Sequence, residues 1–222
     1  MKITIKRIAK KYGKNEVLKD ITFSAESGKC IGILGSNGCG KSTLLSILAG
    51  VQRADGGSFL CDGEDLLKNK AQRSRLVGYV PQGLPFMEEL TAWDNLRLWY
   101  TVQELKYELQ CGVLAQLGIG EFVKMPVHKL SGGMKKRLSI GCAMAGRPRI
   151  LLMDEPTAAL DLVCKEQIHE QLQMYQSAGG TVILTTHDVQ ELSRCDALYI
   201  LKDGVLLPFV YDGNMQGLME RL

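Results

Sequence analysis

The stretch that most restricts the fold of this 222-residue chain runs from Cys30 to Ser42. It opens with the apolar run CIGIL, residues 30–34, which is typical of a strand buried on both faces of a parallel sheet. The glycine-rich segment GSNGCGKS follows directly, and a helical pattern begins near Thr43. Parallel strands need crossover connections, usually helices, so this order of strand, tight loop and helix predicts an α/β fold.

The glycine-rich segment, residues 35–42, matches the phosphate-binding pattern GxxxxGK[ST] in the context that the pattern requires. Glycines let backbone N–H groups turn toward phosphate oxygens, and the following helix N-terminus adds a favourable dipole. Lys41 would give a positive charge to the β- and γ-phosphates, and Ser42 a hydroxyl ligand to Mg²⁺. A ligand-free glycine turn is the alternative, and the placement of the lysine and serine argues against it. The expected nucleotide contacts here are Gly35, Ser36, Asn37, Gly38, Cys39, Gly40, Lys41, Ser42 and Thr43.

A second apolar run, ILLM at residues 150–153, ends in the acids Asp154 and Glu155. Ligands of open α/β sheets bind at the carboxyl ends of the strands, so Asp154 can reach the Mg²⁺ region and Glu155 can polarise a water in line with the γ-phosphate. An acid pair alone is a weak signal, because many strands end in solvated turns. Guanine specificity usually needs NKxD, and the nearest candidate, NKAQ at residues 69–72, lacks the aspartate. The sequence therefore favours ATP.

Composition and charge narrow the class of protein. The 27 Lys and Arg against 24 acids leave a net charge of +3, too small by itself to indicate a nucleic-acid or membrane-surface binder. The seven cysteines form no CxxC pair, which argues against a zinc ribbon and a disulfide framework. The N-terminus does not resemble a secretion signal, and no run approaches the roughly 20 apolar residues of a membrane span. Any contact with a membrane is expected to go through a partner.

The organisation along the chain predicts one domain, residues 1–222, with two lobes. Strands are expected at residues 1–8, 19–26, 149–153, 181–185 and 197–201. Between residues 83 and 146 helical spacing replaces the strand signal, and Thr91 with Asp94 predicts a capping box that opens a helix through Trp99. We therefore expect an α/β ATP-binding lobe at residues 1–82 and 147–222, and a helical lobe at residues 83–146.

The chain resembles the nucleotide-binding domain of an ABC transporter over nearly its whole length. LSGGMKKRLSIG, residues 130–141, is similar to the signature motif of that family, usually LSGGQ, and precedes the paired acids as the family requires. The resemblance implies that Ser131, Gly132 and Gly133 close over the γ-phosphate of an ATP held by another subunit. The implied catalytic residues are Glu155, His187, Gln82 and Lys41, and the implied metal ligands are Ser42, Gln82 and Asp154.

Four of the positions that match the family each have an ordinary alternative. Tyr12 matches the aromatic that stacks on adenine, and it could be an exposed side chain. Gln82 matches the glutamine that joins the lobes and approaches Mg²⁺ and the attacking water, and it could be a solvated loop residue. Asp161, in the loop ALD that crosses to the other subunit, could cap the next helix. His187 matches the histidine that contacts the γ-phosphate, and it could be a core histidine. The resemblance favours the functional role in each case.

The resemblance also implies a fold and an assembly. The fold is a P-loop NTPase (RecA-like) parallel-sheet lobe with an antiparallel β subdomain and an inserted α-helical lobe. Two ATPase subunits, identical or paralogous, would pair head-to-tail around two ATP with Mg²⁺, and hydrolysis would drive transport through integral membrane subunits. The chain would then be cytoplasmic and peripheral on the inner face of the cell membrane, with no nucleic-acid partner. The alternative is a soluble ABC ATPase of translation or DNA repair; those proteins tend to carry a tandem fusion or a coiled-coil insertion, and this chain has neither.

Several positions depart from the family pattern or stay open. Met134 replaces the usual signature glutamine, and SGGMKKRL with LTAWDNL at residues 90–96 is similar to the drug, lipid and polysaccharide exporter branch. Cys39 stands where a small residue is usual; it is either just small or, beside Lys41, a reactive thiol. The apolar segment at residues 84–87 resembles a docking region for a membrane subunit and could also be local core. The cations at residues 135–137 could face a nearby triphosphate or solvent.

Overall fold

The computed structural model describes residues 1–83, 85–158 and 160–221. In this part of the chain one 10-stranded sheet has the order β5-β4-β1-β2-β10-β9-β3-β8-β7-β6. Its strands are β1 (Lys2–Tyr12), β2 (Asn15–Glu26), β3 (Cys30–Leu34), β4 (Gly56–Cys61), β5 (Glu64–Asp65), β6 (Val77–Val80), β7 (Ile150–Asp154), β8 (Thr181–Thr185), β9 (Ala197–Lys202) and β10 (Val205–Phe209).

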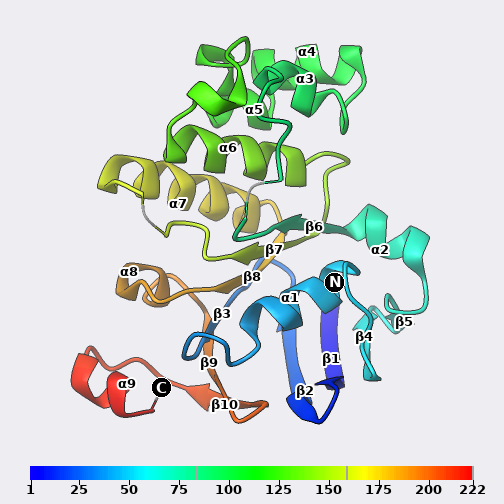
Figure 1. Cartoon of the computed structure of the whole chain (residues 1–222), viewed down its shortest axis with the longest axis vertical. Coiled ribbons are helices and arrows are strands. Elements are labelled where there is room, and N and C mark those ends of the chain that lie inside the picture. The colour runs from blue at the N-terminus through cyan, green and yellow to red at the C-terminus, as the bar shows by residue number, and fades with distance from the viewer. Residues whose placement is uncertain (84, 159, 222) are drawn as a thin grey trace.

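The helices complete the α/β pattern, and α3 to α6 gather at one end of the molecule (Figure 1). The α-helices are α1 (Lys41–Ala49), α2 (Lys70–Leu76), α3 (Ala92–Leu96), α4 (Val102–Cys111), α5 (Val113–Gln116), α6 (Gly132–Ala143), α7 (Leu162–Ser177), α8 (Val189–Leu192) and α9 (Met215–Arg221). Short 3₁₀ turns cover Ile119–Glu121 and Val127–Lys129.

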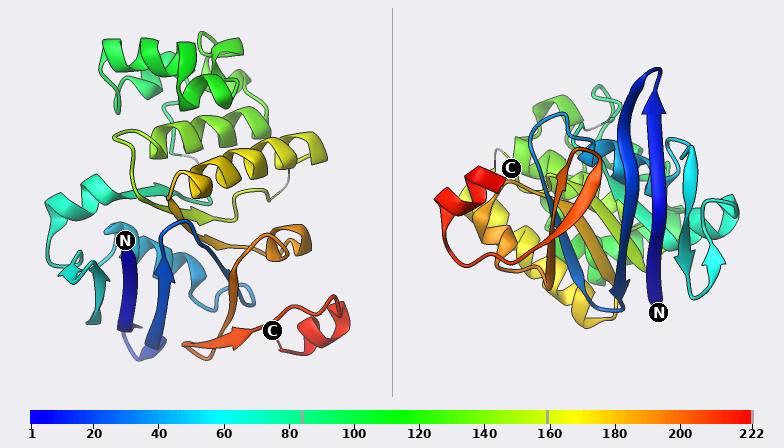
Figure 2. Two further views of the ribbon diagram at one scale, coloured as in Figure 1. Left: turned by 180° about the vertical axis from the view of Figure 1, so that it is seen from behind. Right: turned by 90° about the horizontal axis from the view of Figure 1, so that it is seen from below.

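The sheet has a parallel part and an antiparallel part. Strands β9, β3, β8, β7 and β6 pair in parallel, whereas β2, β1, β4 and β5 pair antiparallel. Figure 2 shows the β1–β2 hairpin standing beside the parallel strands when the molecule is seen from below. The parallel lobe, the antiparallel part and the helical end are the three parts predicted from the sequence.

Both faces of the parallel strands are buried, as the uninterrupted apolar runs predict. Alternate residues point to opposite sides. Ile31, Ile33 and Ile183 pack with helix α1 and the antiparallel strands, while Val182 and Leu184 pack with α6 and α7. The loops that leave the carboxyl ends of these strands are therefore held on a rigid layer, which positions the candidate site.

The structure corrects several predicted boundaries. Strands β3 and β8 have the predicted limits, but β1 and β2 extend to a tight hairpin, and α1 begins at Lys41 rather than near Thr43. The capping box of Thr91 and Asp94 is present, yet helix α3 ends at Leu96 and not at Trp99. The reason is local, because Thr101 forms a second capping box that starts α4 and holds its own backbone extended. Strands β4, β5, β6 and β10 were not predicted, since they are short or carry weak alternation.

Within the residues that the structure describes, helices long and apolar enough to span a bilayer are absent.

Candidate functional site at the carboxyl ends of the parallel strands

The loop between β3 and α1 has the backbone that a phosphate cradle needs. Gly35, Gly38 and Gly40 have φ of 155°, 81° and 111°, in or near the region that favours glycine. A Cβ added to Gly35 would lie 2.6 Å from the carbonyl oxygen of Leu201 and 2.6 Å from Cys39 Sγ. The Cys39 thiol thus fills the inside of the loop and packs toward the core, which favours its interpretation as a small packing side chain.

Lys41 lies inside this loop. Its side chain is buried, and its Nζ donates to the carbonyl oxygens of Gly35 at 2.7 Å and Ser36 at 3.0 Å. The ammonium therefore sits among the backbone groups that would surround a phosphate, and both bonds are ones that an anionic ligand could replace. The next backbone amides belong to the first turn of α1, where N–H groups lack helical partners.

Asp154 and Thr185 join the ends of β7 and β8, where they are register partners. Asp154 is 2% exposed, and Thr185 Oγ1 donates to its Oδ1 at 2.6 Å. The Ser42 hydroxyl, the Gln82 amide and the Asp154 carboxylate can all offer oxygen ligands, the kind that Mg²⁺ prefers. The donor set predicted from the sequence therefore fits this ion.

Glu155 is the residue on which the loops after three neighbouring strands converge. Gln82, which follows β6, donates from Nε2 to Glu155 Oε2 at 2.9 Å. His187, which follows β8, places Nε2 3.5 Å from Glu155 Oε1. The backbone N–H of Glu155 donates to Thr185, at 3.2 Å to the carbonyl and 3.1 Å to the hydroxyl. A cavity of about 550 Å³ opens beside Glu155 and His187. The structure thus brings together Glu155 and Gln82, which were assigned to the attacking water, and His187, which was assigned to the γ-phosphate.

His187 is half-exposed, and its pKa lies below the usual 6.5 because of burial first and the Lys41 charge second, with Glu155 opposing them. A histidine with a lowered pKa is neutral at pH 7 and can donate through one ring nitrogen while the other accepts.

We expect the imidazole of His187 in the nucleotide-free chain to titrate below pH 6.5, because burial and Lys41 both disfavour its charged form. The measurement is an NMR titration of the ring protons, with the His187→Gln variant assigning the signal among the three histidines. The unfolded chain, in which the histidine has its usual pKa of 6.5, binds the proton at a higher pH than the folded chain does. The contribution of His187 to the free energy of unfolding therefore falls as the pH drops below 6.5. A midpoint at or above 6.5 would contradict the packing described here.

Tyr12 is the last residue of β1, at the turn of the β1–β2 hairpin, and is not part of the phosphate-binding loop. It is 47% exposed, its hydroxyl donates to Gln52, and Lys10 Nζ lies 5.5 Å from the ring centroid. The hairpin touches the loop nearby, because a Cβ added to Gly40 would lie 2.8 Å from Val17 Cγ1. The hairpin that carries Tyr12 therefore borders the phosphate-binding loop.

The signature residues form the exposed N-terminus of α6. Ser131 is the N-cap, and its Oγ accepts from the N–H of Met134 at 3.2 Å. Ser131 and Gly132 are exposed, and a Cβ on Gly133 would lie 2.5 Å from Cys164 Sγ of α7. Among the hydrogen bonds and ion pairs of the described residues, none joins residues 131–133 to residues 35–43.

The loop after β7 contains the cap of helix α7. Asp161 caps α7, with Oδ1 accepting from Cys164 N at 2.9 Å, as the sequence predicted. Ala159 in the same loop lies outside the described residues, as does Leu84 of the predicted docking segment. In that segment Phe86 packs toward the helical core, while Met87 is 53% exposed.

The three cations after the signature have three different environments. Lys135 pairs with Glu88 at 3.1 Å, and Arg137 donates to the Leu117 carbonyl at 3.1 Å. Lys136 is 5% exposed, so the interpretation of this run as a solvated face is wrong for its middle member. Its Nζ reaches the carbonyl oxygen of Glu155 at 3.3 Å.

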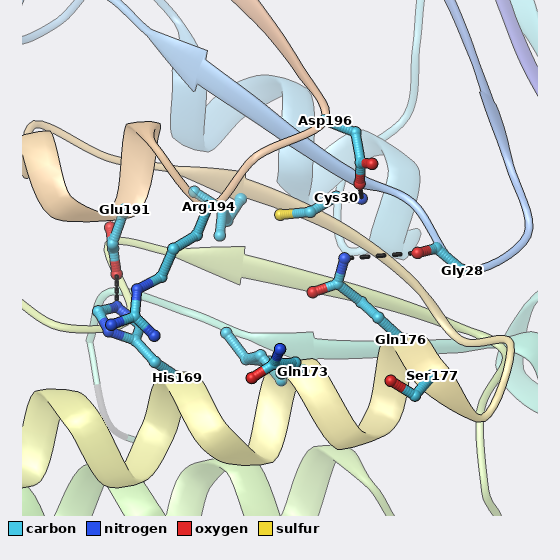
Figure 3. Close-up of a pocket in the computed structure, with 11 residues that line it drawn as sticks. Gly28, Cys30, His169, Gln173, Gln176, Ser177, Glu191, Arg194 and Asp196 are labelled. Carbon is cyan, nitrogen blue, oxygen red and sulfur yellow. Dashed lines mark hydrogen bonds and ion pairs between the residues drawn. The ribbon is translucent and has the colours of Figure 1, made fainter. Parts of the chain in front are cut away.

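A separate cavity of about 380 Å³ lies between α7 and the starts of β3 and β9, with His169, Gln176, Arg194 and Asp196 on its walls (Figure 3). None of the residues assigned to the site from the sequence lines it. Glu191, on its wall, also borders the cavity beside Glu155.

Sequence reasoning missed two residues of the site. Thr185 stands in the segment TTHD, residues 185–188, where only the histidine received a role, and a polar residue at a strand end was the available signal. Lys136 gave no usable signal, because a lysine in a basic run at a helix start is normally solvated.

Comparison with known proteins agrees with this geometry. The family model described as ABC transporter matches residues 18–158. The chain is 35% identical over 220 residues to the linearmycin resistance ATP-binding protein LnrL of Bacillus subtilis, covering 97% of this chain and 70% of that protein. It is 35% identical over 214 residues to the sulfate/thiosulfate import ATP-binding protein CysA of Neisseria meningitidis serogroup B, covering 92% of this chain and 60% of that protein.

Among solved structures, a dimeric ATP-binding cassette in a post-hydrolysis state with ADP and Pi is similar at 27% identity. Its TM-score is 0.79, and the match covers 92% of this chain and 96% of that one. A second dimeric structure of the same cassette has a TM-score of 0.80. The likeness confirms the predicted P-loop NTPase fold. The chain therefore belongs to the ABC transporter family, among its ATP-binding ATPase subunits.

Proposed function

We propose that the chain hydrolyses ATP at two composite sites, formed by head-to-tail pairing with a second ATPase subunit, and so drives transport through separate membrane subunits. The observation that carries the proposal is the convergence of Gln82 and His187 on the Glu155 carboxylate, with His187 close enough to Lys41 of the phosphate-binding loop to feel its charge. A binding module without turnover would have no use for a carboxylate held in that way.

In this proposal the residues of the loop hold the triphosphate of ATP. Lys41 exchanges its carbonyl partners for phosphate oxygens, and the glycine backbone offers N–H groups around them. Ser42, Gln82 and Asp154 would hold Mg²⁺, which would neutralise charge on the β- and γ-phosphates when bound.

Glu155 is the proposed general base. Its carboxylate takes a proton from the attacking water, while Gln82 orients the carboxylate and the water. His187, neutral at pH 7, has one ring N–H, which it can donate either to the Glu155 carboxylate, 3.5 Å away, or to the γ-phosphate. The site excludes little water in a single chain, because one side of it is open to the cavity beside Glu155 and His187.

Pairing with a second subunit supplies the missing wall. The N-terminus of α6 has its first N–H groups free for an anion, and Ser131 and Gly132 are exposed. We propose that these groups close over the γ-phosphate bound by the partner, so that ATP joins the two subunits and hydrolysis releases them. The dimeric ATP-binding cassette among the similar structures supports such pairing.

We propose export as the direction of transport. The support is the signature with Met134 and the segment LTAWDNL, residues 90–96, together with a relative that serves linearmycin resistance. An import ATP-binding protein is equally similar, so the sequence pattern carries this part of the proposal. The place of action would be the inner face of the cell membrane, by way of the membrane subunits.

Replacing Tyr12 by Ala is expected to raise KM for ATP by about 5- to 150-fold, because stacking of a base on an aromatic ring is worth about 1–3 kcal/mol. Steady-state ATP hydrolysis measures it. Tyr12→Phe is the matched control, since it keeps the ring and loses only the bond to Gln52. A Phe variant as weak as the Ala variant would assign the effect to the hydroxyl and remove the stacking role.

The assembly is tested by purifying the native complex from membranes and identifying what accompanies the chain. An integral membrane protein in fixed stoichiometry is the expected partner. Recovery with ribosomes or DNA instead would favour a soluble ABC ATPase and overturn the transport proposal.

A further inference from the structure

Lys136 is a buried cation on the helix whose first turn carries the signature. Its Nζ donates to the Glu155 carbonyl at 3.3 Å. Burial lowers the pKa of Lys136, while the carboxylates of Asp154, Glu191 and Glu155 act in the opposite direction. A buried charge is costly unless it is paired and hydrogen-bonded, and here one lysine feels three acids from two segments, the end of β7 and helix α8.

Glu155 has a backbone that needs to be held. Its φ is 48°, a conformation that few residues other than glycine adopt and that persists only where surrounding contacts impose it. Its N–H is held by Thr185 of β8, and its C=O by Lys136 of α6. The peptide groups on both sides of the proposed base are thus fixed by different elements, one from the sheet and one from the signature helix.

We propose that Lys136 is a positioning residue for ATP hydrolysis, whose bond to the Glu155 carbonyl ties the signature helix to the backbone that aims the Glu155 carboxylate. The inference rests on the proposed role of Glu155 as the base. Because Lys136 lies little more than one turn after Gly132, the helix end that docks on the partner's phosphate and the base of the chain's own site move as one body. Docking of the α6 N-terminus on the partner's phosphate would therefore alter the position of Glu155 in this chain's own site.

The Lys136→Met variant tests this, since it keeps the length of the side chain and removes the charge and the donor. We expect kcat to fall by about 10- to 100-fold, as for a misplacement near 1 Å at a reacting group, with KM for ATP unchanged. The ATP-dependent dimer should still form, as it should when Glu155 itself is replaced by Gln. Lys202→Met is the control, because it also removes a lysine-to-carbonyl bond, at 3.1 Å to Arg221, away from the site.

A folded Lys136→Met variant with wild-type kcat would overturn the inference, and so would one that loses the ATP-dependent dimer, because the lysine would then serve α6 in general. If the Met variant does not fold, Lys136→Leu is measured instead, because it also removes the donor; the same loss in kcat at constant KM supports the inference and a wild-type kcat refutes it. Hydrolysis by the wild type and by Lys202→Met keeps the proposed function intact in either case. Absence of hydrolysis in the wild type would be a failure of the proposed function itself.

Discussion

Replacing Glu155 by Gln is expected to lower kcat for ATP hydrolysis by about 10²- to 10⁴-fold, the usual contribution of a general base, and to leave ATP binding intact. The amide keeps the shape and the bond to Gln82 but takes no proton from water. ATP should then persist between two subunits, and a stable ATP-bound dimer should accumulate. Phosphate release measures the first effect, and size-exclusion chromatography with and without ATP measures the second.

Asp65→Asn is a control for this variant, because it also neutralises a carboxylate near the end of a strand, with hydrogen bonds to Phe59 N and Leu67 N, outside the site. It should bind and hydrolyse ATP as the wild type does. Unchanged turnover in Glu155→Gln would remove Glu155 as the base, and with it the reason for the convergence of Gln82 and His187.

The Lys41→Ala variant should fail earlier, at nucleotide binding. Charge-assisted hydrogen bonds contribute about 1.5–3 kcal/mol, so the Kd for ATP should rise by roughly 10- to 150-fold. Loss of a donor to the transferred phosphoryl group should also lower kcat by about 10²- to 10³-fold. Equilibrium binding of a fluorescent ATP analogue separates the two effects.

A structural explanation of the Lys41 result also has to be excluded. In the nucleotide-free loop the ammonium bonds two carbonyls, so its loss could loosen the loop. Lys41→Met keeps the stem that is buried there and should bind ATP as weakly as the Ala variant. Recovery of ATP binding in the Met variant would show that the loop, and not the charge, had been the cause.

The parallel strands and the phosphate loop could be predicted because each is a local signal. CIGIL is buried on both faces, and the glycines after it require unusual φ values that the structure shows. The strand ends then follow from topology, since parallel neighbours bring Asp154, Glu155 and His187 to one edge. Gln82 needed the family resemblance, because nothing local separates it from a solvated loop residue.

What could not be predicted depends on contacts between distant segments. Lys136 reaches across 19 positions to the Glu155 carbonyl, and Thr185 across 30 to its N–H. From the sequence alone, a basic run at the start of a helix predicts a solvated face. Only the packing of α6 against the sheet turns Lys136 inward. Helix α3 ends early for a different and local reason, since the capping box at Thr101 starts the next helix.

The composite site is the central claim, and mixing two inactive variants tests it most directly. Lys41→Ala keeps an intact signature, and Gly132→Asp keeps an intact loop while placing a negative charge where the phosphate would bind. Gly132 has room for a side chain, with Leu160 Cδ2 3.9 Å from an added Cβ, so the fold should hold. Each variant alone should be inactive, and the mixture should regain ATP hydrolysis, because one site then joins an intact loop to an intact signature from the other chain. A mixture as inactive as its components would contradict the account.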